Sequence, residues 1–89
     1  MVKAERKITI VKGIPVTDYV LEIIAEFNKG YRRIALYAVG DNICKLANIV
    51  SLIKDRIGDG VRIVDWRIGS KRRMGERYTF LEITLEYGV

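Results

Sequence analysis

The sequence contains no histidine and only one cysteine, Cys44. One cysteine excludes a disulfide within the chain, and without imidazole or clustered thiolates there are no ligands for a structural zinc site. The lack of histidine also removes the commonest general base near neutral pH, and with it the Ser-His and Cys-His pairs of most hydrolases. We therefore expect no metal, no cofactor and no enzymatic activity.

Long apolar runs and glutamine are absent as well. Hydrophobic residues make up 49% of the chain, but they are dispersed among charges, so no stretch approaches the length needed to cross a membrane. No apolar segment follows Met1, so nothing resembles a secretory signal, and we expect a soluble, cytoplasmic protein. The lack of glutamine, together with 30% charged residues, suggests a thermophilic source.

The chain has 89 residues, which predicts one domain over residues 1–89, and it shows no internal repeat or linker. A chain of this size buries only about 60–65% of its unfolded surface, so it gains stability by associating. We therefore expect an oligomer.

Hydrophobic periodicity predicts six elements in the order βαβαββ. Strands are expected at Arg6–Val11, Arg32–Val39, Val61–Ile68 and Tyr78–Tyr87, and helices at Pro15–Phe27 and Ile43–Ile57. A change of phase in the third strand predicts a bulge near Val64-Asp65. The expected fold is of the α+β class, an α/β two-layer sandwich. It has a four-stranded mixed sheet, both helices on one face, and an extended hairpin arm between the last two strands.

The segment Gly69–Arg77 carries four cations and two glycines between two strand-like segments. The net charge is +4 from Arg67 to Arg77 and +3 up to Gly13, in a chain of +5. Each cation that neutralises a phosphate releases counterions, so this arm is expected to bind a nucleic-acid backbone with a steep salt dependence and little reading of sequence. The alternative is that a charged tip only protects a sheet edge from aggregation.

The first helix carries an acidic stripe opposite its apolar side. Asp18, Glu22 and Glu26 recur every four residues, so we expect nucleic acid to avoid this face. On the second helix, Ile49 and Leu52 extend the apolar surface sideways, which indicates that this helix is covered on more than one side.

Other candidate residues each have two interpretations. Trp66 can stack on a base, but its strand phase favours a core or interface position. Tyr78, beside the arm, is a stacking candidate or a cross-strand packing residue, and Cys44 is a reactive thiol or, preferably, a helix-packing residue. Glu82 and Glu86 lie about 13 Å apart along a strand, too far for two-carboxylate catalysis, so a solvated surface is favoured.

Four segments follow one another at particular spacings: Pro15–Val20 (PVTDYV), Ala38–Lys45 (AVGDNICK), Arg67–Ser70 (RIGS) and the strand through Leu81–Ile83 (LEI). No single segment is specific. Together they resemble the Alba family of small archaeal chromatin and RNA-binding proteins over nearly the whole chain. The resemblance implies a dimer that sits over the nucleic-acid backbone near the loops preceding both helices, with paired arms reaching towards the minor groove.

The resemblance and the charge pattern together assign candidate nucleic-acid contacts on the arm and on the body. The arm contacts are expected to be Lys71, Arg72, Arg73 and Arg77, and the body contacts Lys12, Asn42 and Lys45. The dimer interface is expected at Ile49 and Leu52, with Phe80 as a third candidate, although ordinary core packing explains the same residues.

The chain departs from the family pattern at three places. Gly13-Ile14 stand where the family typically has a lysine pair, acetylated in some members, so no acetylation switch is expected there. The loop before the second helix, commonly rich in arginine, carries Asp41, which repels phosphate. Ile57 stands where relatives often carry an aromatic used between neighbouring dimers, so this cooperative contact is not expected to carry over.

We therefore expect a non-enzymatic, dimeric protein that binds duplex DNA or structured RNA and resides on the nucleoid. The departures from the family imply weaker body contacts and a larger share for the arms, or a preference for RNA. The alternative is a heterodimer subunit that pairs with a relative and touches nucleic acid little itself. A nuclease is a distant third, because no metal cluster supports one.

Overall fold

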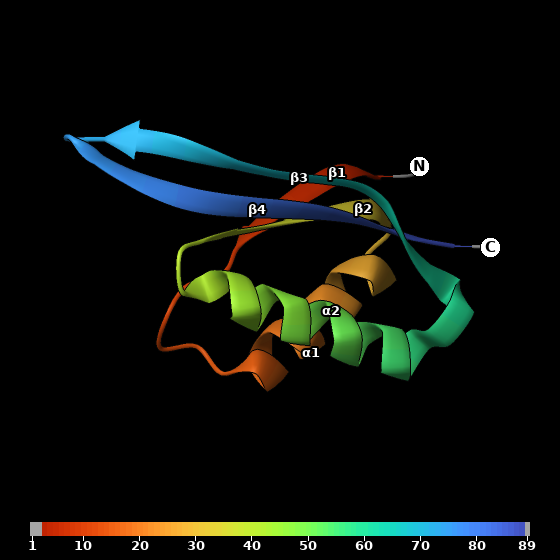
Figure 1. Cartoon of the computed structure of the whole chain (residues 1–89). Helices are drawn as coiled ribbons and strands as arrows, with labels where there is room; N and C mark the ends of the chain where they lie inside the picture. Colours follow the sequence, from red (N-terminus) through yellow and green to blue (C-terminus); the bar gives the residue numbers. More distant parts are fainter. Residues whose placement is uncertain (1–2, 89) are drawn as a thin grey trace.

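The computed structural model describes residues 3–88, which form two helices packed beneath one four-stranded sheet (Figure 1). The strands are β1 (Lys3–Thr9), β2 (Tyr31–Val39), β3 (Val61–Arg73) and β4 (Glu76–Tyr87), the helices are α1 (Val16–Asn28) and α2 (Asn42–Ile57), and a 3₁₀ turn spans Gly58–Gly60. The sheet order is β1-β2-β4-β3, with β1 parallel to β2 and the other pairs antiparallel. The predicted fold class and element order are confirmed. Neither of these two helices is both long and apolar enough to cross a bilayer.

The core lies between the helices and one face of the sheet, because apolar residues alternate along the two central strands. Ile34 and Leu36 of β2 lie directly opposite Leu85 and Ile83 of β4, so all four side chains point towards the helices. The helices complete the core with their apolar stripes, which include the fully buried Ile23, Leu46, Ile49 and Ile53. Each fully buried side chain of this size contributes about 1.5–3 kcal/mol.

The predicted bulge in β3 is confirmed as a register shift between Ile63 and Asp65. Beyond it, Trp66 and Ile68 pair with apolar residues of β4 that face the helices, so they lie on the same side of the sheet as Ile63. Neither helix covers these three side chains, which are 48%, 63% and 59% exposed for Ile63, Trp66 and Ile68.

The last two strands continue past the helices as a long hairpin, the arm (Figure 1). The β3–β4 ladder runs without a break from Asp65 to the Arg73–Glu76 pair. The two residues of the turn, Met74 and Gly75, have φ of 52° and 82°, and two positive φ values are typical of the type I′ turns of tight hairpins. The segment that was predicted as a connection between Ile68 and Tyr78 is therefore itself paired strand.

The predicted acidic stripe on α1 does not extend to Glu26. This carboxylate is only 5% exposed; its Oε1 accepts a hydrogen bond from Lys29 Nζ at 3.1 Å, and its Oε2 lies 3.5 Å from Arg6 Nε on β1. A step of four residues advances about 40° around a helix, so the third member of such a stripe has rotated towards the sheet. Asp18 and Glu22 remain exposed.

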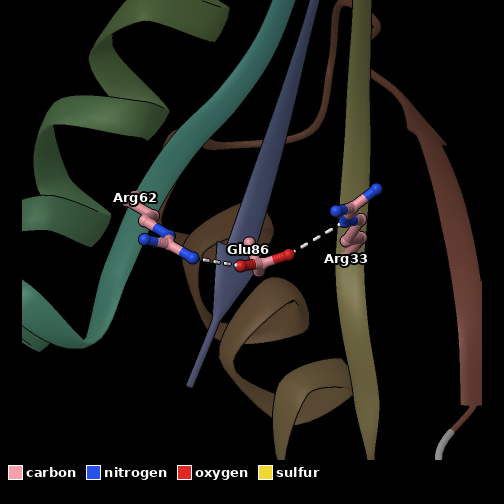
Figure 2. A network of polar contacts seen from close by, with 3 residues as sticks. All are labelled: Arg33, Arg62 and Glu86. Atoms are coloured by element: carbon pink, nitrogen blue, oxygen red, sulfur yellow. Dashed lines mark hydrogen bonds and ion pairs between the residues drawn. The ribbon is translucent and has the colours of Figure 1, made fainter. Parts of the chain in front are cut away.

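The face of the sheet opposite the helices, here called the helix-free face, is held together by ion pairs across β4. Glu86 accepts hydrogen bonds from Arg33 Nε of β2 at 2.9 Å and from Arg62 Nη2 of β3 at 2.7 Å (Figure 2). These bonds, that from Arg62 first and that from Arg33 second, hold the pKa of Glu86 below its ordinary value of 4.5. One carboxylate thus joins three neighbouring strands.

This network predicts a specific pH dependence of stability. A carboxyl group whose pKa falls on folding contributes stability that is present above its unfolded pKa and is lost as the pH falls through its folded pKa. We expect Glu86→Gln to have a lower free energy of unfolding than the wild type near neutral pH, and the difference to shrink as the pH falls below about 4.5. Urea denaturation over a pH series measures it.

The matched control is Glu22→Gln, which removes an exposed carboxylate of α1 for which the structure shows no ion pair among residues 3–88. A stability difference for Glu86→Gln that persisted unchanged in acid would contradict the assignment.

Candidate nucleic-acid interface

The arm presents a group of cations that are not paired with carboxylates. All four predicted arm contacts are exposed, and within the described part of the chain none lies within 4.0 Å of a carboxylate oxygen. They are Lys71, Arg72, Arg73 and Arg77. Three arginines of the sheet body behave differently, because Arg33, Arg62 and Arg67 are each paired with a glutamate of β4.

The hairpin register places two of the arm cations against each other. Arg72 and Arg77 are direct cross-strand partners near the end of the arm. Like charges directly opposite on neighbouring strands repel each other. An anion held between or beside them would relieve this repulsion.

The loops that precede both helices meet at the base of the arm. Gly40 N donates a hydrogen bond to Thr79 O at 2.8 Å, which attaches the β2–α2 turn to β4. Val11 N donates to the hydroxyl of the buried Tyr19 at 2.8 Å, and Lys45 Nζ donates to Val11 O at 2.9 Å. The β1–α1 loop is therefore fixed against both helices.

The predicted body contacts are gathered at this end, but they are partly occupied. Lys45 is half-buried, with its ammonium group bound to the loop and 5.5 Å from the centre of the Tyr19 ring. Lys12 lies 4.0 Å from Asp41, and both side chains are almost fully exposed, at 80% and 93%. Asn42 is half-buried at the start of α2. Of the three predicted body contacts, Lys12 has the most exposed side chain, and the carboxylate of Asp41 lies beside it.

The three predicted dimer residues do not share one surface. Ile49 is fully buried in the core of the chain, so the core interpretation describes it. Leu52 is 38% exposed on α2. Phe80 lies on the helix-free face, where its ring is stacked with that of Tyr37. The sequence pattern marked these residues as apolar but did not place the two α2 residues and Phe80 relative to one another.

A separate apolar surface lies on β3. We call Ile63, Trp66 and Ile68 the β3 patch, because all three face the helix side of the sheet and are about half exposed or more. The sequence favoured a core or interface position for Trp66, and its 63% exposure excludes the core. In the sequence, the sign of this patch is the change of apolar phase in the third strand near Val64-Asp65.

Cys44 is exposed on α2. This corrects the packing role favoured from the sequence. The buried stripe of α2 begins at Leu46, and two helical steps place Cys44 about 200° away from it.

Comparison with known proteins finds relatives over nearly the whole chain. The Alba family model matches residues 7–70. The chain is 31% identical to "DNA/RNA-binding protein Alba 2" of Saccharolobus shibatae and 33% identical to that of Saccharolobus solfataricus, with 97% of each chain covered in both alignments.

Two solved structures share the fold. Alba from Thermoplasma volcanium superposes with a TM-score of 0.82 at 22% identity, over 91% of this chain and 99% of that chain. ALBA1 from Trypanosoma brucei superposes with a TM-score of 0.81 at 13% identity, over 93% of this chain and 69% of that chain.

The position of Asp41 beside Lys12 leads to a prediction for the affinity of a variant that lacks the Asp41 charge. If phosphate approaches these loops, Asp41→Asn is expected to raise the affinity for a DNA duplex by about threefold at low salt, because it removes a like charge, and by less at high salt, where exposed charges are screened. Fluorescence anisotropy measures this. The control Asp55→Asn, an exposed acid late in α2, is expected to change nothing. Equal effects of the two substitutions would contradict an approach at Asp41.

Proposed function

This chain belongs to the Alba family, and on that premise we propose that it is a non-enzymatic nucleic-acid-binding protein that holds the phosphate backbone of duplex DNA or structured RNA with its hairpin arm. The observation that carries the proposal is the group of four exposed arm cations without carboxylate partners among residues 3–88. The relatives are named as DNA/RNA-binding proteins, which supports the same function.

The arm suits a groove because its cations lie on both sides of a thin ribbon. Side chains alternate along β3, so Lys71 and Arg73 point to one face of the hairpin and Arg72 points to the other. A minor groove is only about 6 Å wide and is bordered by phosphates on both sides. A ribbon with cations on both faces can meet both borders. Such contacts position the protein without reading the base sequence.

A second copy of the chain is the proposed occupant of the β3 patch. Monomeric proteins rarely expose a contiguous apolar patch of large side chains without a partner, and the commonest assembly of identical chains is a two-fold dimer. Ile63, Trp66 and Ile68 lie on an edge strand, next to the covered core, so a second patch can extend that core across the interface. The exposed Leu52 of α2 remains part of this proposal.

One observation favours a different role, that of a heterodimer subunit with little nucleic-acid contact of its own. Asp41 stands 93% exposed beside Lys12, and the loop before α1 contributes no further cation between Lys12 and the helix. The body therefore offers weak attraction to phosphate. In this alternative, a related chain supplies the body contacts.

The arm model is tested with Arg72→Ala/Arg73→Ala. Each phosphate contact contributes about −0.9 to the slope of log K against log salt concentration for B-DNA. We expect the double variant to bind DNA and RNA duplexes more weakly at low salt and with a slope shallower by about 2. Anisotropy titrations over a salt series measure both quantities.

The charge-matched control for the arm is Arg32→Ala/Arg56→Ala, which removes two exposed cations at the start of β2 and the end of α2. An equal loss of slope in this control would show that net charge alone drives binding. If the wild type bound neither duplex and bound only after mixing with a relative, the subunit role would replace the proposal.

The dimer is tested with Ile68→Asp, which places a charge in the β3 patch. We expect this variant to sediment as a monomer, because an unpaired carboxylate resists burial in an apolar interface. Leu21→Asp on α1 is the control, since Leu21 and Ile68 have nearly equal exposure, 58% and 59%. The control is expected to sediment as a dimer. Sedimentation velocity distinguishes the outcomes, and a dimeric Ile68→Asp protein would contradict the assigned interface.

A further inference from the structure

Two aromatic rings lie together on the helix-free face at the base of the arm. Tyr37 of β2 and Phe80 of β4 have ring centroids 5.8 Å apart and planes inclined by 27°. This separation lies within the range of offset-stacked aromatic pairs. Both side chains keep part of their surface exposed. They stand on the two central strands of a four-stranded sheet whose other face is covered by helices.

The third strand makes room for this arrangement. Gly69 of β3 is the cross-strand partner of Phe80, and a Cβ atom at Gly69 would lie 2.9 Å from Phe80 Cε1. The backbone of Gly69 does not have a positive φ, so space and not conformation requires the glycine. The ring of Phe80 therefore lies across the backbone of β3.

The ammonium groups of two lysines lie over the rings. Lys71 Nζ lies 5.2 Å from the Phe80 centroid and 5.8 Å from the Tyr37 centroid, and Lys7 Nζ lies 4.9 Å from the Tyr37 centroid. Lys7 is also paired with Glu82 at 3.3 Å, whereas Lys71 has no carboxylate within 4.0 Å among residues 3–88. Lys71 therefore places an unpaired ammonium group beside the aromatic rings, where a phosphate can reach it.

The charges on the two sides of the aromatic rings differ in sign. Away from the arm, the helix-free face has a polar hollow of about 340 Å³ whose charged lining is net negative. Its charged residues are Glu5, Asp65 and Glu82 against Arg33 and Arg67. Towards the arm, Lys71 pairs with Tyr78 and the next positions carry the arm arginines. A phosphate chain that starts at the rings meets no net positive charge at the hollow, whereas the arm attracts it.

We propose that Tyr37 and Phe80 form a stacking platform for unpaired bases of RNA, with Lys71 at the adjoining phosphate and the strand leading onto the arm. Stacking on aromatic side chains of an open sheet face is a general way to hold unpaired bases, and RNA presents such bases in loops and bulges. The proposal rests on the proposed function, since the arm supplies the backbone attraction. It adds the two rings of the helix-free face, which a duplex held by the arm does not need.

The test compares oligouridine with an abasic strand of the same length, alongside an RNA duplex. The strands share the phosphate chain, so the ratio of their affinities isolates stacking. We expect the wild type to bind oligouridine about tenfold more tightly than the abasic strand or better, and Tyr37→Leu/Phe80→Leu to bind both strands equally. Leucine keeps the sheet covered but offers no flat ring. Duplex affinity is expected to change by less than about twofold.

Two further variants separate stacking from folding. Gly69→Ala keeps both rings but displaces that of Phe80, so it is expected to lower the oligouridine preference without changing duplex binding. Tyr87→Leu is the matched control, because Tyr87 is also a partly exposed ring, stacked on Phe27 with centroids 5.1 Å apart. It is expected to keep the wild-type preference. Thermal melting shows whether each variant is folded.

The outcomes distinguish this platform from the arm. A wild type that binds duplex RNA but does not prefer oligouridine over the abasic strand overturns the platform alone. So does a folded Tyr37→Leu/Phe80→Leu protein that keeps the preference. A wild type that binds none of the three probes overturns the platform and the proposed function together. Arg72→Ala/Arg73→Ala is expected to weaken all three complexes while the oligouridine preference remains.

Discussion

The pairing of β4 is the constraint on which the rest of the structure depends, because this strand is bonded to β3 along its whole length and to β2 over residues 80–86. Side chains alternate across a strand, so β4 assigns residues to both faces of the sheet at once. Leu85 faces the helices, whereas Glu86 and Phe80 lie on the helix-free face. A shift of one residue would exchange the two sets and place carboxylates in the core, which the cost of burying unpaired charge forbids.

The same strand sorts the cations of the sheet into two groups. In the body of the sheet, Glu86 pairs with Arg33 and Arg62, and Glu82 pairs with Arg67 and Lys7. Those four charges are already compensated. Beyond Phe80, the one carboxylate of β4 is Glu76, and the structure shows no ion pair for it among residues 3–88. An exposed ion pair contributes only about 0–1 kcal/mol, so unpaired cations on the arm cost the fold little. Their attraction remains available to an external anion.

The parts of the structure that the sequence predicts are those in which one face is buried. Alternation within β2 and β4 and the phase change at Val64-Asp65 leave a pattern of apolar residues, so the sheet and the bulge could be predicted. Between Ile68 and Tyr78 neither face is buried, and the strand there is formed by pairing and by its turn, which leaves no such pattern. The arm cations were identifiable because lysine and arginine are exposed by default. The contact of Tyr37 with Phe80 was not, since it depends on strand order and register.

The end of the body beneath the arm is close to electrical balance, whereas the arm carries uncompensated positive charge. Lys12 faces Asp41, and the ammonium group of Lys45 is bound to the Val11 carbonyl, so a phosphate at the loops meets little uncompensated charge. The arm side chains, in turn, contribute nothing to the core, so substitutions there can alter what is bound without altering the fold. Replacing Arg33 or Arg62 would instead break an ion pair that joins strands. This separation is consistent with one architecture recurring at 13–22% identity, because the contacts that hold the sheet together do not involve the exposed side chains of the arm.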